Sequence, residues 1–106
     1  MTVDERLRNA VKPIVPECSP HLYRGKSDEY CTWNYNELGA VFGDDTEDCG
    51  RYLLQLHYFL PHGRNGSNVK KRIKKALTDA GFTSPDILDV SDEEGQHYTF
   101  EFELEE

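Results

Sequence analysis

The sequence predicts an α+β domain in which two main helices flank a mostly antiparallel sheet of four to six strands. Residues 98–104 alternate strictly between apolar and polar side chains, which is typical of a strand with one buried face. Residues 51–60 form a longer strand pattern, and residues 68–80 repeat apolar side chains at helical spacing. The 106 residues suit one domain spanning positions 1–106 and leave no room for a second.

The chain is expected to begin with a helix over residues 3–11. Thr2 or Asp4 can cap this helix, and Pro13 ends it because proline cannot continue the helical hydrogen-bond ladder. Residues 18–22 are expected to form an irregular connector.

The middle of the chain reads as strands. Residues 30–36 alternate large apolar with polar side chains, and residues 40–42 predict a short strand before an acidic loop at residues 43–48. The strand over residues 51–60 carries apolar side chains on both faces, so we expect it to lie at the centre of the sheet and to be partly covered on both sides.

A basic helix and a hairpin complete the pattern. The helix covers residues 68–80, with Ser67 or Asn68 as its cap and Gly81 in the left-handed position that commonly ends a helix. A strand at residues 87–90 is then joined to the closing strand 98–104 by a turn whose sequence is Asp-Glu-Glu-Gly.

Charge limits the possible functions. The chain has 12 basic and 20 acidic residues and a net charge of −8, which disfavours generic binding to duplex DNA as the main activity. Six basic residues fall between Arg64 and Lys75, and ten acidic residues follow Lys75. This asymmetry suits head-to-tail self-association or docking into a larger assembly, and a simply solvated surface is the alternative.

Targeting and cysteine patterns predict a soluble cytosolic protein. No stretch approaches eighteen apolar residues, and the charged residues 1–8 lack the apolar core of a signal peptide. The cysteines Cys18, Cys31 and Cys49 are widely spaced and form no C-x-x-C pair, so free thiols are expected.

Two groups of residues raise the possibility of a metal or acid–base site. His57 and His97 lie on predicted strands, and pairing of these strands would bring two imidazoles and a carboxylate together. No H-x-H or H-E-x-x-H pattern enforces such a site, and structural or surface histidines are the reading that the sequence favours, so no metal ligand is assigned. The acidic loop supplies oxygen ligands without the spacing of a calcium loop; it is otherwise a solvated turn or a charged contact surface. Its carboxylates are Asp44, Asp45, Glu47 and Asp48.

The basic helix can bind phosphates, contact an acidic protein surface or simply be solvated. Nucleic-acid recognition requires aromatic or amide side chains among the cations, and this helix has none. The cations considered as contact residues are Lys70, Lys71, Lys74 and Lys75. No enzyme motif, catalytic residue or cofactor-binding motif is found, so we expect a protein that is not an enzyme.

The order of features resembles the tail terminator, or tail completion, proteins of long-tailed bacteriophages and prophages. The likeness runs through the segments Pro13–Pro16, Tyr23–Gly25, Glu29–Tyr35, Asp44-Asp45, Tyr52–Phe59, Ile73–Phe82 and His97–Phe102. It covers residues 10–104, and the helix that ends in Ala80-Gly81-Phe82 is one of the matching segments.

The resemblance implies a structural protein of the virion tail or neck, assembled in the bacterial host cytoplasm. Copies would form a ring, usually a hexamer, on the last tail-tube subunits, stop tube polymerisation and present the surface that joins the head connector. DNA would pass through without being read, and no membrane is involved. The acidic loop is then expected at a subunit interface or the lumen, and the four lysines against a neighbouring subunit or partner.

Three alternatives remain open from the sequence. The first is a head-side completion or adaptor protein of the phage neck. The others are a small metal-binding protein that uses His57, His97 and the acidic loop, and a nucleic-acid-binding regulator that acts through the basic helix.

Overall fold

The computed structural model describes residues 2–38 and 51–105, which form two helices and a five-stranded sheet. In chain order the elements are α1 (Val3–Val11), β1 (Cys18–Pro20), β2 (Tyr30–Leu38), β3 (Arg51–Leu60), α2 (Ser67–Asp79), β4 (Asp86–Asp89) and β5 (Gln96–Glu105). The predicted α+β class is confirmed. The predicted strand at residues 40–42 lies outside the described residues.

The strands lie in the order β1-β2-β3-β5-β4, and β1 runs parallel to β2 while the other three pairings are antiparallel. The sheet is therefore mixed, with β3 at its centre as its sequence predicted. Because α2 connects β3 to β4, and β5 is inserted between these two strands, the C-terminal half is a crossover unit closed by a hairpin.

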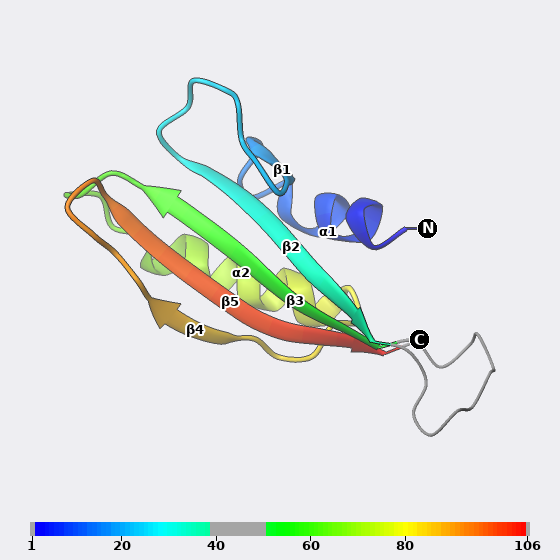
Figure 1. Cartoon of the computed structure of the whole chain (residues 1–106). Coiled ribbons are helices and arrows are strands. Elements are labelled where there is room, and N and C mark those ends of the chain that lie inside the picture. The colour runs from blue at the N-terminus through cyan, green and yellow to red at the C-terminus, as the bar shows by residue number, and fades with distance from the viewer. Residues whose placement is uncertain (1, 39–50, 106) are drawn as a thin grey trace.

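Both helices cover the same face of the sheet (Figure 1), and the core lies in the single layer between the helices and the sheet. Alternation along the strands directs Trp33, Leu56 and Phe100 toward the helices, where all three side chains are fully buried. Leu7 and Val11 of α1, and Ile73 and Leu77 of α2, complete this layer with no exposed surface. The second face of β3 has no helix over it among the described residues, and Gln55, His57 and Phe59 on that face are half-buried, so the cover on this side is partial as expected.

The cap of α1 is the residue expected from the sequence. Thr2 Oγ1 accepts a hydrogen bond from the Glu5 backbone N–H at 3.1 Å, and Glu5 Oε1 accepts one from the Thr2 N–H at the same distance. This reciprocal pair satisfies two amides that the helix itself leaves free. Asp4, the other candidate, instead accepts a hydrogen bond from Trp33 Nε1 at 2.9 Å.

Two predictions are wrong. Residues 18–20 are not irregular but form edge strand β1, held to β2 by bonds such as Cys31 N–H to the Glu17 carbonyl at 2.9 Å. The helix α2 is capped by neither Ser67 nor Asn68, because Gly66 is its N-cap residue and provides no side-chain hydrogen bond. A Cβ at Gly66 would lie 3.1 Å from a Leu60 methyl carbon, so a larger residue at this position would require that methyl group to move.

Candidate functional site on the open face of the sheet

The face of the sheet that no described helix covers, here called the open face, is built from alternate residues of β2, β3 and β5. Residues paired across neighbouring strands point to the same side, so the register groups the open-face side chains into rows. One row joins Thr32, His57 and Thr99, and the adjacent row joins Tyr30, Phe59 and His97. Thr32 and Thr99 retain only 7% and 5% exposure, so the central part of this face is desolvated by its own side chains.

An aromatic row crosses the upper half of the open face, which is the half near the end of β3 and the start of β5. Tyr23, from the loop before β2, stacks on Tyr30 with 4.4 Å between ring centroids, and Tyr30 stacks on Phe59 at 4.7 Å. Phe59 in turn stacks on His97 at 4.2 Å. The rings face one another within 23°, so their flat surfaces are used inside the row. Such a row stiffens the face but offers few free ring surfaces to nucleic-acid bases.

The register of β3 and β5 brings the two candidate histidines together. His57 Nδ1 lies 2.9 Å from His97 Nε2, and His57 Nε2 lies 3.1 Å from Asn34 Oδ1. With that amide oxygen as acceptor, His57 carries its proton on Nε2, and its Nδ1 lone pair accepts the hydrogen bond from His97. Burial lowers the pKa of both imidazoles, and at His57 the neighbouring His97 lowers it further.

The carboxylate expected beside the histidines does not join them. Within the described residues, no group of three or more His, Cys, Asp or Glu side chains is arranged to hold a metal ion. The nearest partner is instead the amide of Asn34, which the sequence did not reveal because only the strand register places it next to His57. In the sequence, the one feature that marked Asn34 as a candidate partner was its position on the polar side of β2.

Beside His97 the surface is hollowed by a depression of about 500 Å³. Its lining includes three carboxylates, those of Asp28, Asp92 and Glu94. Asp28 forms an exposed ion pair with Arg64 at 3.1 Å. The negative charge of Asp92 raises the pKa of His97, but burial of the imidazole lowers this pKa by more. The hollow is therefore a region of negative potential next to the imidazole pair.

The lower half of the open face, toward the start of β3 and the end of β5, is polar and acidic. A groove of about 620 Å³ is lined by amides and carboxylates, including Asn34, Gln55, Asp86, Glu101 and Glu103. Gln55 Nε2 donates a hydrogen bond to Glu101 at 3.2 Å, and Glu103 pairs with Arg51 at 3.3 Å. Asp86 and Glu101 remain exposed, so this half of the face carries net negative charge.

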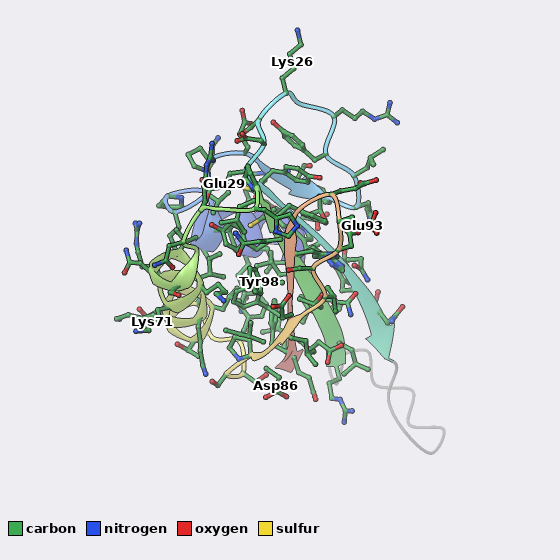
Figure 2. All side chains as sticks on the ribbon, turned by 90° about the vertical axis from the view of Figure 1, so that its left-hand side faces the viewer. Lys26, Glu29, Lys71, Asp86, Glu93 and Tyr98 are labelled. Carbon is green, nitrogen blue, oxygen red and sulfur yellow. The ribbon has the colours of Figure 1, made fainter. Side chains whose placement is uncertain are left out.

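The opposite side of the molecule is basic. Figure 2 shows Lys71 on the side of α2 that points away from the sheet, and Lys74 is exposed like Lys71. Two of the candidate lysines are already engaged within the chain: Lys70 Nζ lies 3.7 Å from the centroid of the Tyr98 ring, and Lys75 pairs with Asp79 at 2.8 Å. Within the part of the chain that the structure describes, Lys71 and Lys74 form no ion pair.

The other candidate contact residues, Asp44, Asp45, Glu47 and Asp48, lie outside the described residues, as does Cys49. Cys31 is fully buried, and burial raises the pKa of its thiol well above the usual range; burial also raises the pKa of the half-buried Cys18. A raised pKa suppresses the reactive thiolate, so neither cysteine has the environment of a nucleophile.

Comparison with known proteins gives no family for this chain, since no protein-family model and no curated protein matches it. Neither described helix is long and apolar enough to cross a membrane.

Proposed function

We propose that this protein is a structural, non-enzymatic subunit that forms a ring on the end of a bacteriophage tail tube. In this role it stops tube polymerisation and provides the surface that joins the head. The proposal extends the tail-terminator resemblance, and its main structural support is the opposite charge of the two outer surfaces of the fold. Lys71 and Lys74 lie on the outer side of α2, whereas Asp86 and Glu101 lie on the open face.

This arrangement suits a head-to-tail contact. A two-layer fold directs its helix layer and the free side of its sheet in opposite directions, so two unlike surfaces are available on each copy. Contacts between unlike surfaces repeat from copy to copy and close into a ring when the rotation permits. Charge complementarity at such a contact selects the partner and its orientation.

The partners in this proposal are other copies of the chain, the tail-tube protein and the head connector or completion protein. DNA passes through the ring without being read, in agreement with the net charge of −8 and with aromatic rings already stacked on one another. The protein would be assembled in the bacterial cytoplasm and then reside in the virion. No catalytic group or cofactor is required.

Electron microscopy of lysates tests the proposal when the gene is inactivated in a phage or prophage that carries it. We expect tails of irregular or excessive length beside unattached heads. Tails of normal length beside heads that fail to join would instead assign the protein to the head side of the neck. Ordinary infectious particles would overturn the structural role altogether.

A further inference from the structure

The imidazole pair on the open face has a geometry that the proposed assembly role does not use. His57 and His97 direct two ring nitrogens at each other across adjacent strands, with 2.9 Å between His57 Nδ1 and His97 Nε2. Both rings are half-buried, and each is held against Phe59, with ring centroids 6.2 Å and 4.2 Å away. The pair is therefore positioned before any ligand arrives.

We propose that His57 and His97 form a two-nitrogen binding site for a divalent transition-metal ion that favours right-angled coordination, with Ni²⁺ as the test ion. Imidazole nitrogen is a preferred ligand for nickel, copper and zinc. The open face supplies two ligands, and water molecules complete the coordination. This site is independent of the proposed role in tail assembly.

The nitrogen–nitrogen distance favours a right angle at the metal. Metal–nitrogen bonds of about 2.0–2.1 Å at about 90° place the two nitrogens about 2.8–3.0 Å apart, whereas a tetrahedral angle requires about 3.3 Å. The observed 2.9 Å matches the nitrogen–nitrogen separation of the first arrangement, so the strands need not move apart, and the two rings turn until both lone pairs point at the ion instead of at each other. Zn²⁺ in its usual tetrahedral geometry requires the rings to separate, so it should bind more weakly than Ni²⁺.

Asn34 prepares His57 for this role. Because Asn34 Oδ1 accepts a hydrogen bond from the His57 Nε2–H at 3.1 Å, the Nδ1 lone pair of His57 is the one that points toward His97. To offer Nε2 to the metal, His97 moves its proton to the other ring nitrogen and turns its ring so that Nε2 faces the ion. Neutral imidazole is the form that binds a metal ion.

The surroundings also favour a cation. The hollow beside His97 contains the carboxylates of Asp92 and Glu94, which raise the local concentration of positive ions. Neither carboxylate completes a three-residue metal site within the described residues, so the coordination remains open on the solvent side. An open position of this kind is available to water or to a side chain of another molecule.

Titration calorimetry with Ni²⁺ on chelator-treated protein near neutral pH tests the site. We expect one ion per chain, loss of this binding in both His57→Gln and His97→Gln, and roughly 10–100-fold weaker binding in Asn34→Ala, which removes the orienting amide. The matched control is His62→Gln, which changes an exposed histidine whose ring hydrogen-bonds to the Asp92 carbonyl. His21→Asn is a second control, because asparagine tolerates the positive φ of 63° found there.

A second measurement separates loss of the site from loss of the fold. Paramagnetic Ni²⁺ should broaden the NMR signals of the His57 and His97 rings first, and the variants should keep the thermal unfolding transition of a folded domain. Unchanged Ni²⁺ affinity in either glutamine variant would overturn the proposal. So would the absence of binding to the folded wild-type protein, or tighter binding of Zn²⁺ than of Ni²⁺.

Discussion

The Tyr58 hydroxyl is a buried polar group whose environment links it to a neighbouring carboxylate. The Tyr58 side chain has no exposed surface, and its hydroxyl donates a hydrogen bond to Glu29 Oε2 at 2.5 Å. Burial, and then the bond and charge of Glu29, raise the pKa of Tyr58 above its ordinary value of 10.0. Both causes penalise the phenolate, so the folded state retains the proton more strongly than the unfolded chain does.

This difference predicts a loss of stability in alkali. Below pH 10 both states are protonated and the contribution is complete; above pH 10 the unfolded chain releases the proton first, and the free energy of unfolding falls. The slope attributable to Tyr58 approaches about 1.4 kcal/mol per pH unit. Urea unfolding of wild type and Tyr58→Phe between pH 8 and pH 12 measures it, and the stability gap should narrow as the pH rises above about 10.

Glu29→Gln is the partner variant for this experiment. It removes the carboxylate while leaving Tyr58 buried, so it should retain part of the alkaline slope. If Tyr58→Phe lost stability in alkali as steeply as wild type, the effect would come from other groups, such as the buried thiol of Cys31.

At the scale of the elements, one side-chain bond fixes α1 on the sheet. Trp33, the single tryptophan, is completely buried in β2 and donates its indole N–H to Asp4 in the first turn of α1. Arg8, one turn later, lies over the same ring with 5.9 Å from its guanidinium carbon to the centroid. The helix is thus positioned by both its apolar stripe and this polar contact.

Asp4→Ala is expected to destabilise the domain by about 1–3 kcal/mol, because it leaves a buried indole N–H without its acceptor. Asp4→Asn keeps an acceptor oxygen and should cost less, about 0.3–1 kcal/mol for the lost charge at the helix N-terminus. Urea unfolding followed by the fluorescence of the single tryptophan measures both variants. Equal losses in the two variants would mean that the indole bond contributes nothing.

Sequence periodicity was sufficient to predict those helices and strands whose conformation does not depend on contacts with other elements. The helix over residues 3–11 and the central strand 51–60 were predicted with their observed bounds, because their apolar spacing alone specifies a buried face. Strand β1 was missed, since three residues carry no period and form a strand only by pairing with β2. Gly66 was missed as a cap because its requirement comes from close contact with β3, which no local pattern contains.

The candidate site was predictable only in part for the same reason. The alternation of β5 placed His97 on the polar face, and strand pairing was the stated condition for contact with His57, which the register fulfils. The partner of His57 was unpredictable, because a shift of one residue in the β2 register would turn Asn34 to the other face. The acidic loop lies outside the described residues, so its expected interface role stays a prediction.

At the scale of the whole molecule, charge is separated by layer as well as by sequence. The basic block of the chain became the outer side of α2, and part of the acidic block became the lower half of the open face. Lys70 contacts the Tyr98 ring and Lys75 forms an ion pair with Asp79, so Lys71 and Lys74 are the cations best placed for a neighbour. Asp86 and Glu101 are their counterparts on the open face.

Charge exchange between these two surfaces tests the head-to-tail contact. Reversing Lys71 and Lys74 to Glu places two acidic side chains opposite the acidic open face, and reversing Asp86 and Glu101 to Lys places two basic side chains opposite the basic side of α2. Like charges opposed across an interface cost several kcal/mol. We therefore expect each double variant to associate at least about a hundredfold more weakly and to fail in complementing a phage that lacks the gene.

The decisive outcome is the return of assembly when the reversed charges are combined so that opposite charges face each other again. Copies with both surfaces reversed regain complementarity with themselves, and a mixture of the two double variants can alternate around a ring with an even number of subunits, such as the hexamer implied by the resemblance. Lys12→Glu with Lys26→Glu is the matched control, because it changes the net charge by the same amount at exposed positions outside α2. Tail length and plaque number report the result. If the control pair failed as badly as the α2 pair, or if neither combination restored assembly, net charge and not this contact would explain the loss.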